Sequence, residues 1–266
     1  MKIRRFTPIQ KTFHLLLIAT FLTQAVTGMA RMYSTTFFGR GLASLVGGME
    51  NCLAVHKAVG LAMIVLFACH VVYALFLIFA KKINSHDSMV PNLRDAKDFF
   101  AHLRWMVGGK HPRFGRWGYW EKFDYWAVFW GMVLLGRTGL MLYDPVETSR
   151  YLDGSDLNVA LWAHRLEAIL AMGYIFIVHF GVVILRRDSF PMDQAMWGGH
   201  VDLETVKAER PDWVERLEQT GELKDRLVES PSKPLTALSY LLGLTAVALG
   251  MYLLIGGLMN APLLPW

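Results

Sequence analysis

The stretch that decides the fold is LAVHKAVGLAMIVLFACHVVYALFLIFA, residues 53–80, in which Lys57 is the only charged side chain. A helix needs roughly 20 apolar residues to cross the hydrocarbon core of a bilayer, so this stretch is long enough to span a membrane. It also carries His56 and His70. Ionisable side chains are costly inside a membrane and therefore indicate a functional site.

Four further stretches complete the pattern of an all-α integral membrane bundle. The five predicted transmembrane helices are Phe13–Ala30, Leu53–Ala80, Tyr125–Tyr143, Leu157–Leu185 and Leu235–Met259. Of the 266 residues, 54% are hydrophobic and 18% are charged, a composition that fits a soluble enzyme poorly. The only cysteines, Cys52 and Cys69, exclude a disulfide scaffold and are expected to be packing residues.

Basic residues are concentrated on one side of the predicted spans. Of 27 Lys and Arg residues, 21 lie in the N-terminal segment, in the connection 81–122 and in the connection 186–233. By the positive-inside rule these segments face the cytoplasm. We therefore expect a multi-pass protein of the bacterial inner membrane with a cytoplasmic N-terminus and an outer C-terminus. The net charge of +5 is then a topology signal, and no nucleic-acid binding is expected.

The two cytoplasmic connections differ in kind. Residues 92–107 place Leu93, Phe99, Phe100, Leu103 and Met106 at helical spacing. This spacing predicts a helix that lies along the membrane interface or packs against the helix ends. Residues 202–230 are strongly charged and mostly helix-favouring, with a break at Pro211, and predict a solvated cytoplasmic segment.

Five of the nine histidines lie within or at the ends of the predicted spans: His14, His56, His70, His164 and His179. His56 and His70 are 14 residues apart on the second span, and His164 and His179 are 15 apart on the fourth. In α-helices these separations are about 21–23 Å, with both members of a pair within about 60° on the helix face. Both spans run in the same direction, so His56 can face His164 near the outer surface. His70 can likewise face His179 nearer the cytoplasm.

Two stacked bis-histidine haem sites are the natural occupants of such pairs. Neutral imidazole is a good ligand for haem iron, and apolar helices supply a dry pocket. Zinc would need a tetrahedral cluster of ligands, which the separated pairs do not offer. Proton-relay histidines in a transporter or membrane scaffold are the alternative. No Cys-x-x-Cys-His motif occurs, so covalent c-type haem is not expected.

Small and basic residues near the histidines are candidates for further cofactor contacts. Gly60 and Gly173 lie between the paired histidines, where a small residue would let a flat macrocycle approach the helix. Helix packing is the alternative explanation for either glycine. The candidates for pairing with haem propionates are Arg31, Arg137 and Arg165. An arginine near a helix end can also be a simple interfacial anchor.

Four sets of residues occur in a characteristic order. They are Phe13-His14 with Thr27-Gly28, His56–Gly60 leading to His70, Gly115–Trp126 entering the third span, and His164 with His179. In this order, over residues 5–195, the chain resembles the formate dehydrogenase gamma-subunit family of prokaryotic dihaem b-type cytochromes. The run Phe190–Asp193 is similar to a branch of this family found beside multihaem c-type cytochromes.

The resemblance implies two haems b, and it leaves one ligand open. In the formate dehydrogenase members the ligands correspond to His56 with His164 and to His14 with His179. The b subunits of bc-type complexes have the two-helix pattern that His70 would complete. Equal spacing on parallel helices favours His70, and the resemblance favours His14. The spare histidine would then lie beside the cytoplasmic-side haem, where it suits quinone hydrogen bonding or proton transfer.

The resemblance also implies electron transfer between the membrane quinone pool, such as menaquinone, and a partner outside the membrane. The family's quinone pocket is formed partly by residues entering the third span, where this chain retains Lys122. Glu121 stands there in place of a glutamine. Glu121 and Asp124 are candidates for moving the protons of quinone chemistry, with charges that cap a helix as the alternative.

The sequence thus predicts three parts. These are a four-helix dihaem cytochrome b domain at 1–195, a charged cytoplasmic connection at 196–233, and a fifth transmembrane helix with a short outer tail at 234–266. The predicted function is that of a membrane-anchoring cytochrome b subunit of a respiratory quinone-linked oxidoreductase. Its expected partner is a multihaem cytochrome c or an iron–sulfur protein. A haem-carrying conduit with quinone bound elsewhere is the alternative.

Overall fold

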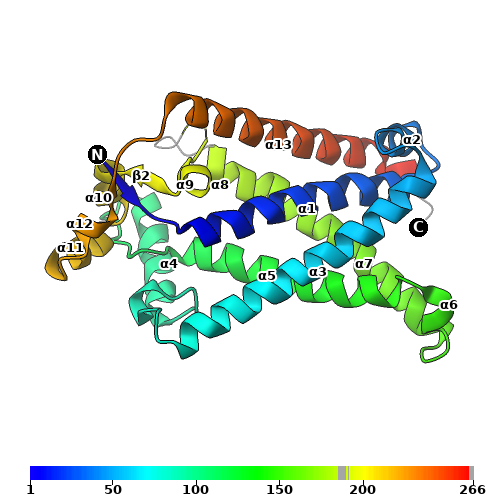
Figure 1. The fold of residues 1–266 in the computed structure, drawn as a ribbon, viewed down its shortest axis with the longest axis horizontal. Coiled ribbons are helices and arrows are strands. Elements are labelled where there is room, and N and C mark those ends of the chain that lie inside the picture. Colours follow the sequence, from blue (N-terminus) through cyan, green and yellow to red (C-terminus); the bar gives the residue numbers. More distant parts are fainter. Residues whose placement is uncertain (185–189, 191, 264–266) are drawn as a thin grey trace. The chain divides into compact units, whose positions relative to one another are not determined.

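The computed structural model describes residues 1–184, 190 and 192–263, and about three quarters of it is helical (Figure 1). The predicted all-helical character is therefore confirmed, with three short strands as an addition. Some predicted features fall outside the described residues. They are the end of the fourth span at Leu185, Pro191 in the run Phe190–Asp193, and the last three residues of the outer tail.

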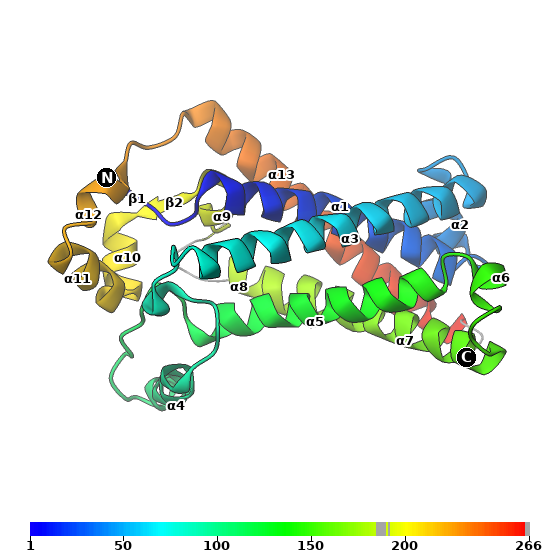
Figure 2. The same cartoon turned by 60° about the horizontal axis from the view of Figure 1, so that its bottom comes forward.

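Long helices cover the predicted spans. They are α1 (Pro8–Met32), α3 (Met49–Phe79), α5 (Tyr119–Met141), α7 (Gly154–Gly173) and α13 (Lys233–Asn260). α7 continues through a π-helical turn, η2 (Tyr174–His179), into α8 (Phe180–Ile184) (Figure 2). The shorter elements are α2 (Phe37–Ser44), η1 (Ser85–Asp87), α4 (Leu93–Met106), α6 (Pro145–Thr148), α9 (Ala195–Gly198), α10 (Leu203–Glu209), α11 (Pro211–Gln219), α12 (Leu223–Arg226) and η4 (Ala261–Leu263).

Four stretches of the described chain are long and apolar enough to cross a membrane. They are Pro8–Met32, Met49–Phe79, Gly154–Val182 and Lys233–Leu263. The third predicted span forms α5 but is not among the four. Asp124 and Arg137, together with tryptophans and glycines, lower the hydropathy of that helix. The chain therefore has several apolar helices of membrane-spanning length, as expected for a multi-pass membrane protein.

The chain divides into two compact units, and the division falls inside α1, α3, α5 and α13. Unit 1 comprises residues 1–11, 71–129 and 193–239. Unit 2 comprises residues 12–70, 130–192 and 240–266.

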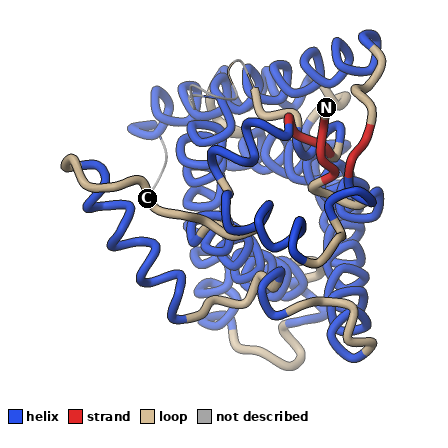
Figure 3. The backbone as a smooth tube through the Cα atoms, turned by 90° about the vertical axis from the view of Figure 1, so that its left-hand side faces the viewer, coloured by secondary structure: helices blue, strands red, loops and turns tan. Residues whose placement is uncertain are grey.

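Unit 1 contains a small antiparallel sheet in the order β2-β1-β3, whose strands are red in Figure 3. Its strands are β1 (Lys2–Arg4), β2 (His200–Asp202) and β3 (Leu227–Val228). Ile3 in the central strand pairs with Val201 on one side and with Leu227 on the other. The N-terminal residues therefore hold together both ends of the charged segment that follows α9.

The segment predicted to be solvated is in fact folded around a core of its own. Ile3, Val206, Trp213, Val214 and Leu217 are buried together in unit 1. Residues one helical turn apart face the same side, so α11 presents Trp213 and Leu217 to the sheet strand that carries Ile3. The high charge of the segment hid this apolar stripe, and the prediction of a solvated segment is wrong.

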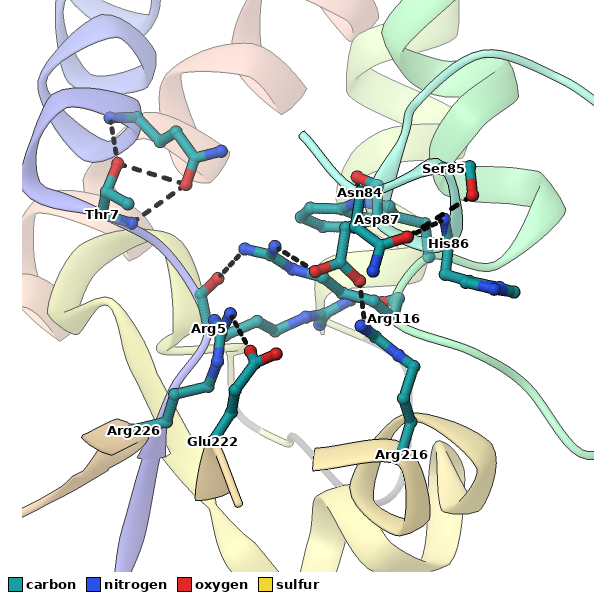
Figure 4. Close-up of polar contacts among 12 residues, drawn as sticks. Arg5, Thr7, Asn84, Ser85, His86, Asp87, Arg116, Arg216, Glu222 and Arg226 are labelled. Carbon is teal, nitrogen blue, oxygen red and sulfur yellow. Dashed lines mark hydrogen bonds and ion pairs between the residues drawn. The ribbon is translucent and has the colours of Figure 1, made fainter. Parts of the chain in front are cut away.

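The carboxylate of Asp87, which is 10% exposed, connects other parts of unit 1 to this core. Asp87 accepts hydrogen bonds from Arg116 at 3.1 Å and from Arg216 on α11 (Figure 4). Arg116 also donates to the main-chain oxygen of Arg5 at 2.9 Å. These bonds join the N-terminal segment, the connection 81–118 and α11, which are far apart in the sequence.

The predicted helix in residues 92–107 is confirmed as α4. Its N-terminus has a capping box, in which the Asn92 side chain accepts from the Arg94 amide at 2.9 Å and Asp95 accepts from the Asn92 amide at 2.6 Å. Phe100 and Leu103 are exposed on this helix, as an interfacial helix requires.

Unit 2 has an apolar core to which α13 contributes. The buried residues are Ala25, Met29, Ala30, Tyr33, Leu42, Ala43, Cys52, Met172, Phe176 and Leu253. The Tyr33 hydroxyl donates to the main-chain oxygen of Gly257 at 2.9 Å. A side chain at Gly256 would collide with the ring of Phe38. Glycines on α13 therefore let this helix pack closely against aromatic side chains of the bundle.

Candidate functional site

Two histidine pairs lie within unit 2. The rings of His56 on α3 and His164 on α7 have centres 6.4 Å apart and planes 78° apart. The rings of His14 on α1 and His179 in η2 also have centres 6.4 Å apart, with planes 46° apart. The four side chains are half-buried. Four of the five predicted histidines therefore form two facing pairs.

The ring separations match the space that one metal ion needs between two imidazoles. A coordinating imidazole nitrogen lies about 2 Å from the metal and the ring centre about 1 Å further, so two opposed rings have centres roughly 6 Å apart. Among the described residues, no group of three or more His, Cys, Asp or Glu side chains could hold a metal ion. Each pair thus offers two axial nitrogens, which suits a cofactor that brings its remaining metal ligands with it.

Hydrogen bonds around the first pair fix the imidazole tautomers. Thr27 Oγ1 lies 2.9 Å from His56 Nδ1, and Thr138 Oγ1 lies 2.9 Å from His164 Nδ1. Each hydroxyl already donates its single proton to a main-chain oxygen, that of Thr23 at 2.7 Å or of Leu134 at 2.8 Å. The threonines must therefore accept from Nδ1–H, which leaves Nε2 of both histidines with a lone pair for a metal.

Glycines follow both threonines and lie against the rings, and the approach is tighter at Gly139 than at Gly28. A Cβ at Gly28 would lie 3.5 Å from His56 Cε1, and one at Gly139 would lie 3.3 Å from His164 Cε1. In two of the three Thr-Gly dipeptides of the sequence, Thr27-Gly28 and Thr138-Gly139, the pair therefore lies against a histidine. Sequence reasoning did not assign these roles to Thr27 or Thr138, although the repeated dipeptide was a usable signal.

The two glycines predicted to face a macrocycle have other surroundings. A Cβ at Gly60 would lie 3.1 Å from Nε2 of Gln24, which donates to the main-chain oxygen of His56 at 2.8 Å. The absence of a side chain at Gly60 thus leaves space for the Gln24 side chain. Gly173 has open space where a side chain would be, and it lines an apolar cavity of about 140 Å³ with Tyr33 and Leu253.

The predicted propionate partners separate into two groups. Arg31 interacts electrostatically with Arg165, and also with His56 and His164. Two guanidinium groups near one histidine pair repel each other, and carboxylates of a bound cofactor would relieve that repulsion. Arg137 is exposed on α5. Of the two histidine pairs, His56–His164 therefore has more cationic side chains near it.

His70 packs edge-on against Phe13, with ring centres 5.3 Å apart. The argument for pairing it with His179 assumed a regular α-helix between His164 and His179. The π-helical turn η2 removes that premise, because a π turn acts as a one-residue insertion and redirects the residues after it by about 100°. The structure brings His14 to His179 instead.

The residues predicted to serve a quinone lie in unit 1, at the start of α5. One oxygen of Glu121 accepts from Arg5 and, at 3.0 Å, from Arg210; the other accepts from the Gly118 amide at 2.8 Å. Burial alone would raise the pKa of Glu121, but Arg210 and Arg5 outweigh it and lower this pKa. A carboxylate held in this way favours a structural role over proton transfer.

The other two candidates at the start of α5 differ in setting. Lys122 is buried and donates to Asp95 at 2.9 Å and to the main-chain oxygen of Val90 at 3.3 Å. It therefore fastens α4 to α5. Asp124 is half-buried and lies about one helical turn after Glu121 on α5. It stays a candidate for proton transfer.

The first third of the chain matches one protein family. The family described as prokaryotic cytochrome b561 matches residues 2–92, a range that includes α1 and α3 with His14, His56 and His70. No curated protein matches the chain. Over its first third the chain is thus similar to prokaryotic membrane cytochromes b, which bind haem b and transport electrons.

Proposed function

We propose that the chain is the membrane-anchoring, b-type cytochrome subunit of a quinone-linked oxidoreductase. It would hold two haems b and pass electrons between a quinone and a redox partner outside the cytoplasm. The observation that carries this proposal is the equal spacing of two histidine pairs, each with ring centres 6.4 Å apart. Bound haem b would supply a one-electron centre at each pair.

In this proposal the ligands are His56 with His164 and His14 with His179. Thr27 and Thr138 hold the first two imidazoles by their Nδ1 atoms, so that Nε2 points away from the hydroxyls. Arg31 and Arg165 provide positive charge for the cofactor carboxylates. The apolar helices around both pairs would provide a pocket of low polarity for the cofactor.

The membrane arrangement is part of the same proposal. α5 would be the remaining span of a five-helix bundle, since its 23 residues are long enough to cross. The basic N-terminus would face the cytoplasm of a bacterium and the end of α13 would face outward. The outer partner would be a multihaem cytochrome c or an iron–sulfur protein, and Asp124 would move protons at the quinone.

The test is anaerobic reduction of the purified protein by a soluble menaquinol analogue, followed by absorption of the reduced b-type bands. We expect quinol to reduce the wild-type protein and to reduce Asp124→Asn at least about 100-fold more slowly, the lower end of the usual loss for a proton-transfer group. Asp156→Asn is the control, since Asp156 is exposed in the first turn of α7. Dithionite should reduce all three proteins fully.

Three results would change the proposal. If Asp124→Asn is reduced by quinol as fast as wild type, Asp124 does not move the protons. If quinol does not reduce the haems of the wild-type protein, the quinone is bound elsewhere and the chain is a conduit. If protein made with ample haem shows no b-type bands, the cytochrome function is lost and a proton-relay transporter takes its place.

A further inference from the structure

The π-helical turn that ends at His179 must be stabilised by contacts with other parts of the fold. η2 covers Tyr174–His179, between two regular α-helical stretches. π-helical turns are rare because their hydrogen bonding and packing are poorer than those of an α-helix, and they occur frequently at functional sites. With a regular helix here, Val178 would lie roughly where His179 now lies, since a π turn counts as one extra residue. The turn therefore decides whether an imidazole faces His14.

Phe176, in the middle of this turn, is the side chain through which the fold supports it. Phe176 is only 2% exposed. Its ring lies 5.9 Å from that of Phe21 on α1 and 5.5 Å from that of Phe180. Phe21 follows His14 by seven residues, two helical turns, and so lies on the same face of α1. Phe176 thus packs against the helix that carries the partner of His179.

On its other side Phe176 fits against α13 at a glycine. A Cβ built on Gly250 would lie 2.6 Å from Phe176 Cδ1 and 2.7 Å from Phe180 Cε2. Both distances are far shorter than an ordinary contact between carbon atoms, about 3.5–4.0 Å. Any side chain at Gly250 must therefore push the two rings that flank His179 in the sequence.

We propose that Gly250 is a positioning residue for His179. Because Gly250 has no side chain, α13 can pack directly against Phe176 and Phe180. This packing stabilises the π turn, and the π turn places the His179 ring opposite His14. The inference rests on the proposed function, because it concerns the ligand of the second haem. It gives the fifth helix a role in the electron-transfer site beyond anchoring the chain.

The test is electron paramagnetic resonance of the oxidised protein, with redox titration of both haems. The signal of a low-spin ferric haem depends on the angle between the planes of its two imidazole ligands. Without a cofactor the ring planes are 46° apart for His14–His179 and 78° apart for His56–His164, so the two haems would have different signals. The two signals are assigned beforehand with His179→Ala and His164→Ala. Gly250→Ala should shift the signal and the midpoint potential of the His14–His179 haem and leave those of the other haem unchanged.

Two further variants separate positioning from general packing damage. Gly256→Ala creates the same kind of collision on α13, against Phe38, and should leave both haem signals as in wild type. Phe176→Leu removes the ring that packs against Gly250 and should shift the same signal as Gly250→Ala does. The proposal is overturned if Gly250→Ala leaves both signals unchanged, or if Gly256→Ala shifts the same signal equally. Wild-type protein without haem would instead refute the proposed function, and with it this inference.

Discussion

Replacing Thr27 by valine removes one hydroxyl and keeps the shape of the side chain. Thr27 is 0% exposed, and its Oγ1 accepts from His56 Nδ1 at 2.9 Å. In the variant the Nδ1–H of His56 loses its partner at a place that water cannot reach. Loss of such a hydrogen bond to a metal-binding histidine costs about 10- to 100-fold in affinity, or about 1.4–2.7 kcal/mol.

The assay is transfer of haem from the purified protein to an excess of apomyoglobin, followed by absorbance. We expect Thr27→Val to release one of its two haems about 10- to 100-fold faster than wild type and the other at the wild-type rate. Thr23→Val is the matched control. Thr23 lies one turn earlier on the same helix, is half-buried, and donates in the same way to the main-chain oxygen of Ala19 at 2.8 Å.

The tautomer argument would be refuted by equal behaviour of the two variants. If Thr27→Val releases both haems at the wild-type rate, the hydroxyl does not orient His56. If Thr23→Val releases haem as fast as Thr27→Val, the effect belongs to α1 in general.

Two other predictions concern the second pair and the charged cluster of unit 1. His14→Ala should lose one haem per chain by pyridine haemochrome assay, whereas His70→Ala should keep two; the opposite result would restore the pairing of His70 with His179. Glu121→Gln should lower the free energy of unfolding by roughly 3 kcal/mol near neutral pH, because it leaves Arg5 and Arg210 without their carboxylate. The pKa of Glu121 is lowered in the folded protein, so its stabilisation is full above the ordinary pKa of a glutamate and is lost as the pH falls through the lowered value. The unfolding temperatures of wild type and Glu121→Gln in detergent should therefore differ near neutral pH and converge in strong acid. A difference in unfolding temperature that is independent of pH would contradict the ionic role of Glu121.

Features with a local cause could be read from the sequence. Hydropathy predicts the helices α1, α3, α7 and α13, because a membrane span needs nothing more than a long apolar run. The facing of His56 and His164 follows from their depth on neighbouring helices that run in the same direction. Each of these histidines contacts a threonine that is followed by a glycine on another helix: Thr27 on α1 contacts His56, and Thr138 on α5 contacts His164.

Features that depend on distant contacts could not be read in this way. The π turn η2 has no periodic signal, and it depends on Phe176 packing against a glycine 74 positions later. The sheet of unit 1 pairs Ile3 with Val201 and Leu227, across more than 190 residues. For Glu121 the sequence left proton transfer and helix capping open, because its partners Arg5 and Arg210 are remote in the sequence.

The central claim is that each histidine pair binds one haem b. The most direct measurement is the haem content per chain, with reduced-minus-oxidised spectra, of wild type, His164→Ala and His179→Ala. We predict two non-covalent b-type haems in wild type and one in each variant, with different midpoint potentials for the two haems that are retained. Equal haem content in all three proteins, or no haem in wild type made with ample haem, would contradict the account.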